Sequence, residues 1–340
     1  MSLSTLLDRQ APLKVLIVKL SSLGDVVHTL PAAMDMQAAF PNAQIDWVVE
    51  RGFAPLAARC TAVHRVIPCE LRRWRKAFFK TDTRAQTRAE WRAFKADLQQ
   101  EAYDVILDLQ GLTKSAWVAW LARKAKVGKR YALANRTDGS GYERPTRWVA
   151  DVVVPITPHS HAVARGRVLC AKALGYEVPT HVNYGLGQAA VQHKPLVALV
   201  HGTSRADKEW PLANWVDLGE RLKQQGFDVA LPHGNDAERL RSEALADLLP
   251  GAVVWPRLSL DALTTEMAQC AGVIGVDSGL SHIAVALDLP HVQIYNFDTA
   301  WRTGPEGLAR QRSVVHAPTP TVDAVWDAWQ SCLHAEGSTE

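Results

Sequence analysis

Several kinds of segment are missing from this 340-residue sequence. No run of about 18 apolar residues occurs, so we expect no membrane-spanning helix. The N-terminus has no basic stretch followed by a long apolar one, and we expect no signal peptide. The five cysteines are scattered and include no Cys-x-x-Cys pair. Their odd number and spacing argue against disulfides and a structural zinc site, and for a reducing compartment.

Motifs that hold common cofactors are absent as well. The turn after the first expected strand is not a GxGxxG dinucleotide fingerprint, and neither GxxxxGK[ST] nor GxSxG occurs. No Asp-x-Asp motif is present, so a metal-bridged diphosphate would lack its usual ligand pair. We therefore expect no metal site and no resident cofactor.

The composition is that of an ordinary globular protein, with 47% hydrophobic and 21% charged residues. The length suggests two domains. A net charge of +3 conceals an asymmetry between the halves. Residues 1–180 carry 27 Lys and Arg against 16 Asp and Glu, whereas residues 181–340 carry 11 against 19. An excess of 11 positive charges in the first half indicates an anionic partner there.

The first half alternates between apolar strands and helices. Residues 14–19, 45–50, 63–68 and 103–110 read as strands, and the first and last are near-continuous apolar runs of the kind found in buried parallel sheets. A helix is expected from the turn at 20–25 to about Phe40, and another after the last of these strands through Lys124. Residues 71–102 read as polar, basic and helical, 131–158 as irregular, and 161–174 as a helix ending at Gly175.

The same alternation restarts after a polar segment rich in proline and glycine. Strands are expected at 195–202, 227–232, 252–256, 272–277 and 291–295, with helices between them. The predicted organisation is a first Rossmann-like domain over 1–176, a linker over 177–194, a second Rossmann-like domain over 195–320, and a helix and tail over 321–340. In such α/β folds ligands bind at the carboxyl ends of the strands.

Two turns lie where a strand of this kind meets a helix. Asp25 follows the first strand, and it is either a helix N-terminal residue favoured by the macrodipole or a general base. The run from Asp277 to His282 follows a later strand, and the N–H groups of Ser278, Gly279 and Leu280 would form an anion site at a helix N-terminus. N-capping is the simpler interpretation of Asp277 and Ser278, and it is compatible with phosphate binding.

Two further loops of the second half belong to the same edge. Thr203, Ser204 and Lys208 supply hydroxyls and an ammonium for phosphate oxygens, and Glu238 is a candidate acceptor for ribose hydroxyls. A charged loop is more often merely solvated. The histidines His28, His201 and His282 lie at similar positions, and each one alone is more often a structural residue than a catalyst.

A basic segment of the first half is the main source of its charge. Arg72, Arg73, Arg75 and Lys76 are followed by Arg84, Arg88 and Arg92, which share one helix face and repel one another unless an anion neutralises them. A solvated helix is the simpler alternative. No nucleic-acid module is recognisable, and an anionic lipid headgroup suits the segment equally well.

Six pieces of the sequence together resemble one family, the lipopolysaccharide heptosyltransferases of glycosyltransferase family 9. The pieces are LKVLIVKLSSLGDVVHTLPA, IDWVVERGF, RRWRKA, YDVILDLQGLTKSA, HGTSRADKEWP and GVDSGLSHIAVALDLP, in this order over almost the whole chain. The resemblance implies a GT-B fold, in which two Rossmann-like domains face each other across a central cleft. It also implies an inverting, metal-independent transfer of L-glycero-D-manno-heptose from ADP-heptose to Kdo of Kdo2-lipid A, and no resident cofactor.

By position in these motifs, the resemblance assigns roles to individual residues. Asp25 matches the catalytic base. The donor-binding set for ADP-heptose is Thr203, Ser204, Lys208, Glu238, Asp277, Ser278, Gly279, Leu280 and His282. The acceptor-binding set is Lys19, Arg72, Arg73, Arg75, Lys76, Gln110 and Lys114. One departure is the order Glu143-Arg144 before Pro145, which leaves Arg144 without an assigned acceptor contact.

The resemblance further implies an enzyme that is peripheral on the anionic cytoplasmic face of the inner membrane. Two alternatives stay open: a related heptosyltransferase that acts on a heptosylated acceptor, and a non-catalytic nucleotide-binding or lipid-binding protein. A nucleic-acid partner is not expected.

Overall fold

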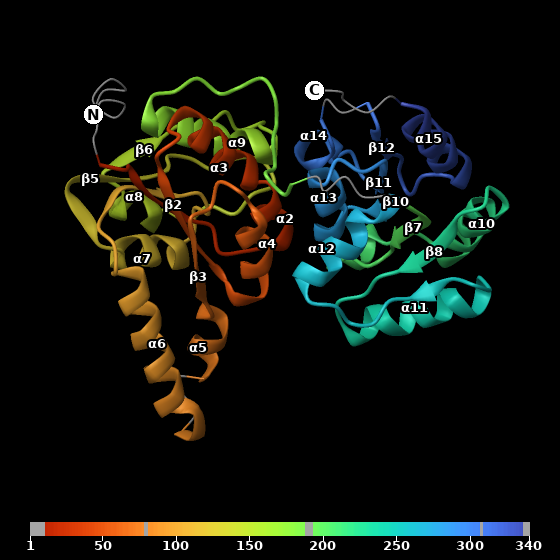
Figure 1. Ribbon diagram of the computed structural model, residues 1–340, viewed down its shortest axis with the longest axis horizontal. Coiled ribbons are helices and arrows are strands. Elements are labelled where there is room, and N and C mark those ends of the chain that lie inside the picture. Colours follow the sequence, from red (N-terminus) through yellow and green to blue (C-terminus); the bar gives the residue numbers. More distant parts are fainter. Residues whose placement is uncertain (1–10, 78–80, 188–192, 307–308, 336–340) are drawn as a thin grey trace. The chain divides into compact units, whose positions relative to one another are not determined.

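The computed structural model describes residues 11–77, 81–187, 193–306 and 309–335. They form two compact units, Met1–Gly185 and Leu186–Glu340, each with its own sheet (Figure 1). The boundary at 185/186 falls within the segment expected to be a linker. In the described part of the chain, no helix is both long enough and apolar enough to cross a membrane.

The first unit contains a six-stranded parallel sheet in the order β3-β2-β1-β4-β5-β6. Its strands are β1 (Lys14–Val18), β2 (Gln44–Glu50), β3 (Arg65–Cys69), β4 (Tyr103–Asp108), β5 (Lys124–Leu133) and β6 (Val152–Val154). Its helices are α2 (Leu23–Val27), α3 (Leu30–Ala39), α4 (Ala54–Arg59), α5 (Leu71–Ala77), α6 (Arg84–Leu98), α7 (Thr113–Leu121), α8 (Pro145–Val149) and α9 (Ala162–Leu174). The residues of β4 are all buried, because helices cover both faces of this sheet.

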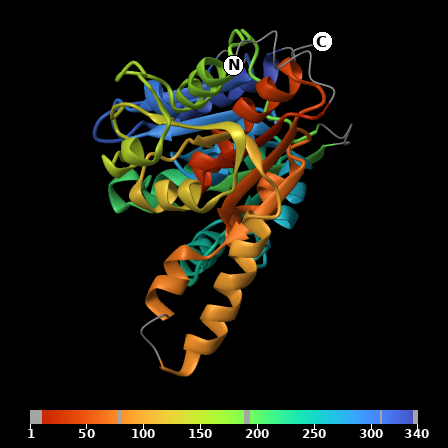
Figure 2. The same cartoon turned by 90° about the vertical axis from the view of Figure 1, so that its left-hand side faces the viewer.

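The strand order fixes which helices share a face. The chain steps one way across the sheet through α2 and α3, and the other way through α6, α7 and α8. Right-handed crossovers therefore put α6, α7 and α8 on one face, while α3 packs with α9 on the other (Figure 1). Figure 2 shows α5 and α6 extending away from the sheet as a helical arm.

The second unit repeats the plan, with the order β12-β11-β10-β7-β8-β9. Its strands are β7 (Lys194–Val200), β8 (Asp228–Leu231), β9 (Val253–Val254), β10 (Cys270–Val276), β11 (His291–Tyr295) and β12 (Gln311–Val315). Its helices are α10 (Leu212–Gln224), α11 (Asp236–Leu248), α12 (Leu260–Ala268), α13 (Gly279–Ala286), α14 (Ala300–Thr303) and α15 (Val322–His334). The C-terminal helix α15 packs against α10, β11 and β12 of this unit, and its Trp329 is fully buried in the core.

Three local expectations were wrong. The helix after β4 ends at Leu121, and Lys124–Leu133 is the strand β5, whose bulge and four basic residues hide any alternation of apolar side chains. The segment 131–158, expected to be irregular, also contains α8 and β6. The helix expected from 25 to 40 is interrupted between α2 and α3, where Pro31 occupies the first turn of the second helix.

A buried ion pair fastens the end of the first unit to its body. The Nε and Nη2 of Arg167 in α9 donate to the Asp35 carboxylate of α3 at 2.6 and 3.1 Å, and both residues are buried. The same guanidinium donates to the carbonyl oxygens of Pro179 and His181. One side chain thus joins two helices to the segment that leads toward the second unit.

We expect Asp35→Ala to destabilise the first unit by about 3–5 kcal/mol, since it leaves the Arg167 charge buried without its carboxylate. The measurement is urea unfolding of the full chain, followed by tryptophan fluorescence. The control is Asp35→Leu with Arg167→Met, which removes both charges and should cost clearly less. An Asp35→Ala variant that unfolds like the unaltered protein contradicts the expectation.

Candidate functional site

The carboxylate of Asp25 lies at the end of β1 within a short run of charged groups. It occupies the first turn of α2, where the N–H of Ser22 donates to its Oδ2 at 3.0 Å. Its Oδ1 is 3.0 Å from the Nζ of Lys19 and 3.6 Å from the Nη2 of Arg165. About 32% of the Asp25 side chain is exposed, whereas Lys19 is buried. The Asp25 carboxylate is therefore held by a buried cation on one side and remains accessible to solvent on the other.

These neighbours decide the ionisation of the acid. Burial raises the pKa of Asp25, but the Lys19 ammonium, the Ser22 N–H and the Arg165 guanidinium outweigh it and hold this pKa well below its usual range. Burial lowers the pKa of Lys19, and the carboxylate opposes that shift. Asp25 is consequently an ionised, partly accessible carboxylate near neutral pH, which suits it to accept a proton.

The loop between β1 and α2 is fixed by side chains from the end of β4. The Gln110 Oε1 accepts the N–H groups of Leu20 and Ser21 at 3.0 and 3.1 Å. Asp108 in turn accepts the N–H groups of Gln110 and Gly111. Burial raises the pKa of Asp108 to about 6. Gln110, which was expected to bind the acceptor substrate, thus holds the loop that leads to Asp25.

Two cations converge on the hydroxyl of Ser21. The Nζ of Lys114 lies 2.9 Å from its Oγ, and the Nη2 of Arg72 lies 3.5 Å from the same atom. Burial and the neighbouring Arg72 lower the pKa of Lys114. Crowded cations of this kind favour binding of an anion, because an anion relieves their mutual repulsion.

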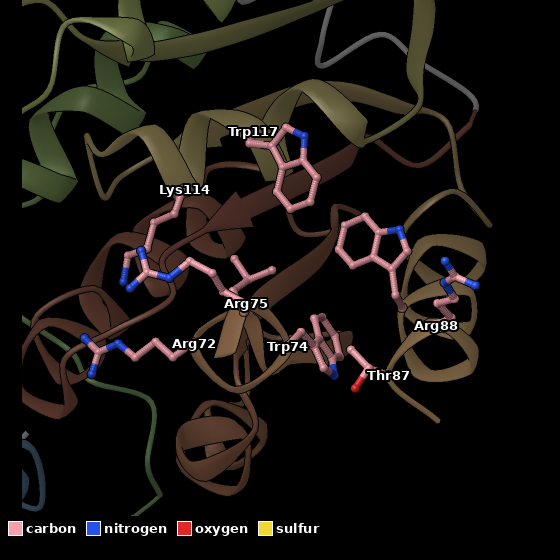
Figure 3. A pocket seen from close by; sticks show the side chains of 9 residues that line it. Arg72, Trp74, Arg75, Thr87, Arg88, Lys114 and Trp117 are labelled. Atoms are coloured by element: carbon pink, nitrogen blue, oxygen red, sulfur yellow. The ribbon is translucent and has the colours of Figure 1, made fainter. Parts of the chain in front are cut away.

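Beside these cations lies a cavity of about 580 Å³ between α5, α6 and α7 (Figure 3). It is lined by Leu71, Arg72, Trp74, Arg75, Thr87, Arg88, Trp91, Lys114 and Trp117. The rings of Trp91 and Trp117 are stacked, with centroids 4.7 Å apart and planes 5° from parallel. The cavity combines an aromatic wall with four cationic side chains, and so suits an amphipathic anion.

The structure divides the basic segment 72–76 between two surroundings. Arg72 and Arg75 line the cavity. Arg73 points elsewhere and pairs with Glu70 at 2.7 Å and with Glu90, so its charge is already neutralised. Lys76 is exposed on α5 and is not part of the cavity lining.

In the second unit, four of the residues expected to bind the sugar donor come together at the end of β10. The Asp277 Oδ2 lies 2.5 Å from the Nζ of Lys208, and its Oδ1 lies 3.5 Å from the Nε2 of His282. The Thr203 hydroxyl donates to the Asp277 carbonyl oxygen at 3.3 Å. Burial raises the pKa of Asp277, but His282 and Lys208 together hold it well below its usual range. Lys208 is thereby kept at the edge where β7 and β10 end.

The first turn of α13 completes this edge. Ser278 is the N-cap in extended conformation, and Gly279 and Leu280 open the helix, so their N–H groups have no partner within it. The Ser278 Oγ is buried without a hydrogen-bond partner among the described residues. A hydroxyl and a set of backbone N–H groups are thus directed at one place, as in an anion site.

Glu238 lies in the first turn of α11 and faces the loops that follow β7 and β8. Its Oε2 accepts the N–H of Gly234 at 2.7 Å, and a Cβ added to Gly202 would lie 2.9 Å from its carboxyl carbon. A larger residue at Gly202 would therefore displace the Glu238 side chain. Ser204 is exposed in the loop that precedes Lys208.

Two features singled out in the sequence, His201 and the segment 142–145, make contacts within the fold. The Nε2 of His201 lies 2.8 Å from the Ser242 Oγ, and burial lowers the pKa of this histidine to about 4, so it is neutral and packed. The departure at 142–145 has a local role as well. The Glu143 carboxylate accepts the N–H of Thr113 at the start of α7, and Arg144 is the N-cap of α8.

Sequence reasoning missed several contributors. Arg165 comes from α9, about 140 residues after Asp25, and no local pattern connects the two. Ser21 and Asp108 were visible at strand ends, and their polarity after an apolar run was the available signal. Of the tryptophans in the cavity wall, Trp74 and Trp91 lie in the segment that reads as polar and basic, and Trp117 lies in the helix expected after β4, where no signal marked it.

Comparisons with known proteins place these features in a family. Residues 91–324 match glycosyltransferase family 9 (heptosyltransferase). The chain is 41% identical over 315 residues to lipopolysaccharide heptosyltransferase 1 of Pseudomonas aeruginosa, covering 89% of this chain and 83% of that protein. It is 24% identical over 311 residues to lipopolysaccharide heptosyltransferase 2 of Escherichia coli K12, covering 83% and 82%.

Solved structures give the same result. The E. coli heptosyltransferase WaaC with ADP superimposes with a TM-score of 0.81 at 35% identity, covering 93% of this chain and 98% of that one. The same enzyme with ADP-2-deoxy-2-fluoro heptose gives a TM-score of 0.76. The expected fold class, an α/β protein of two Rossmann-like domains of the GT-B type, is confirmed.

Proposed function

The chain belongs to glycosyltransferase family 9, the heptosyltransferases, and on that premise we propose that it transfers L-glycero-D-manno-heptose from ADP-heptose to Kdo of Kdo2-lipid A. This is the heptose addition that begins the inner core of lipopolysaccharide. The observation that carries the proposal is the contrast in identity: 41% to a heptosyltransferase 1 against 24% to a heptosyltransferase 2, over similar lengths.

Asp25 is the general base of this proposal. Its ionised carboxylate takes the proton of the attacking Kdo hydroxyl, which displaces ADP from the anomeric carbon with inversion. The Lys19 ammonium makes the acid a weak base before reaction, so proton transfer accompanies bond formation instead of preceding it. Lys19 also prevents Asp25 from taking up a bulk proton at neutral pH.

The donor-binding residues lie in the second unit. Lys208 and the first N–H groups of α13 carry positive charge to the diphosphate, and Glu238 accepts hydrogen bonds from the ribose. Because Lys208 is paired with Asp277, the diphosphate competes with that carboxylate for the ammonium. This supply of positive charge supports a metal-independent reaction, in which protein groups stabilise the leaving ADP.

The acceptor-binding residues lie in the first unit. Arg72, Arg75 and Lys114 surround the cavity beside the Asp25 loop, and their charges suit the carboxylates and phosphates of Kdo2-lipid A. A lipid acceptor further implies that the enzyme works as a peripheral protein on the cytoplasmic face of the inner membrane. The positive excess of the first half supports that location.

The deciding experiment is a product assay with the purified chain, ADP-heptose and two acceptors offered side by side in EDTA. We expect heptose on Kdo2-lipid A and little on the already heptosylated acceptor. The reverse preference would favour the alternative heptosyltransferase. Loss of all activity in EDTA, restored by a divalent metal, would refute metal independence.

We expect Asp25→Asn to keep the fold, at some cost in stability because Lys19 loses its carboxylate partner, and to lower kcat by about 10²–10⁴, the usual contribution of a general base. The measurement is initial rate at saturating ADP-heptose, with the thermal unfolding midpoint as the folding check. Near-normal kcat would remove Asp25 from the role of base.

Lys19→Met gives an independent test of the ion pair. Without the ammonium, burial is the largest influence and the pKa of Asp25 rises, so the protonated, inactive form gains weight as pH falls. We expect the acid limb of the kcat profile to move upward in pH, so that activity falls at about pH 6 relative to pH 8. An unchanged acid limb would show that Lys19 does not control the base.

Arg72→Ala with Arg75→Ala should raise the acceptor KM about tenfold or more while the donor KM changes little, since both residues lie in the first unit beside the Asp25 loop. Arg73→Ala is the matched control from the same helix, because its guanidinium is already paired with Glu70 and Glu90. Equal effects of the double variant on both KM values, or an equal effect of the control on the acceptor KM, would contradict this division.

A further inference from the structure

Three tryptophans are unusually exposed on one face of the first unit. The side chains of Trp117 and Trp120 in α7 are 45% and 59% exposed, and that of Trp148 in α8 is 79% exposed. Indole rings carry a large apolar surface and are seldom left in water without a partner. We call these three residues the tryptophan face.

The topology places the tryptophan face on a single side of the sheet. The helices α7 and α8 follow β4 and β5 in the same direction across the sheet and pack against each other (Figure 1). Their inward positions are occupied by small or short residues, such as Ala116 and Ala119 in α7 and Thr146 in α8, all buried. The exposed indoles must therefore point away from the sheet, on the side that α6 also covers.

The charges around the tryptophan face are cationic. Arg88 and Arg92 of α6 and Arg147 of α8 are exposed, and none of the three forms an ion pair among the described residues. The acids nearest in sequence are occupied by protein donors: Glu90 by Arg73 and Trp74, and Glu143 by the N–H of Thr113. The surface thus presents exposed arginines and apolar rings, while the Glu90 charge is neutralised by Arg73.

We propose that the tryptophan face and its flanking arginines are the surface by which the protein lies on an anionic phospholipid bilayer. Tryptophan is the side chain that settles at the boundary between headgroups and acyl chains, and exposed arginines add attraction to anionic headgroups. Charge complementarity favours this occupant, since a second copy that docked through the same face would bring like charges together. The proposal rests on the proposed function in one respect: a lipid-linked acceptor gives the protein a reason to bind a membrane.

The orientation has a consequence for the site. Lys114, Trp117 and Trp120 are spaced three residues apart along α7, so Trp117 neighbours both Lys114, which reaches the Ser21 hydroxyl, and the exposed Trp120. A bilayer in contact with Trp120 lies alongside the cavity that Trp117 and Lys114 line. A lipid-borne acceptor then reaches the cavity from the membrane without leaving it completely.

The experiment is co-sedimentation of the full chain with vesicles that contain no lipid A, either phosphatidylcholine alone or with about 30% phosphatidylglycerol. We expect binding to the anionic vesicles that weakens as salt rises. Trp120→Ala with Trp148→Ala should lower this binding about tenfold or more, and Arg147→Glu at least about fivefold. Both variants leave the cavity residues unchanged.

Matched controls come from the second unit. Leu240 is 60% exposed on α11 and Arg257 is exposed, so Leu240→Ala and Arg257→Glu repeat the apolar and charge changes elsewhere and should bind vesicles normally. Heptose transfer to a water-soluble, deacylated acceptor is measured in parallel. Variants of the tryptophan face that lose vesicle binding but retain transfer support the proposal. If the unaltered chain itself shows no transfer, the proposed function is wrong, but the membrane-binding surface is still tested by the vesicle experiment.

Three results would overturn the proposal. The tryptophan double variant could bind anionic vesicles as well as the unaltered chain does. Binding could be equal on the two kinds of vesicle, which would leave the arginines no role. The unaltered chain could sediment as a dimer that the double variant abolishes, which would make the face an interface between copies.

Discussion

The buried ammonium of Lys19 is the constraint around which the first unit's site is arranged. A charge at the carboxyl end of the central strand β1 requires an anion, and Asp25 supplies it at 3.0 Å from the adjoining helix. The loop between Lys19 and Asp25 is held in place by the Gln110 side chain. The backbone N–H of Gln110 is in turn bound by Asp108 of the neighbouring strand β4. The carboxylate that we propose as the base is thereby fixed by the same contacts that satisfy a buried charge.

The second unit also pairs a lysine with an aspartate at the end of a central strand. Asp277 ends the central strand β10 and is held by Lys208 and His282. In both units a carboxylate and an ammonium are paired at a strand end, yet the exposure differs. Asp25 is open enough to meet a substrate hydroxyl, whereas Asp277 is buried and serves to place its lysine. The two pairs therefore differ in what they leave accessible: a carboxylate in the first unit and an ammonium in the second.

The charge asymmetry of the sequence separates into distinct uses in the structure. Part of the positive excess is paired with carboxylates: the buried Arg167 joins α9 to α3, and the exposed Arg73 joins α5 to α6. Another part, Arg72, Arg75 and Lys114, surrounds an aromatic cavity. A third part is exposed beside tryptophans. Equal charges in the sequence thus differ in function according to whether a carboxylate, a cavity or solvent faces them.

The sequence by itself determined the two-unit α/β organisation, because buried parallel strands such as Tyr103–Asp108 have an apolar centre, and helix ends such as Gly175 carry their own signals. It also indicated Asp25, Lys208 and the turn at Ser278, since each follows a strand end where ligands bind. Only the tertiary structure decided the partners: Arg165 reaches Asp25 from a helix about 140 residues away, and Arg73 turns to Glu90 while Arg72 turns to Ser21. Local patterns set the helices and strands through backbone and burial preferences. Which charges meet depends on how those elements cross in space, and no local pattern carries that information.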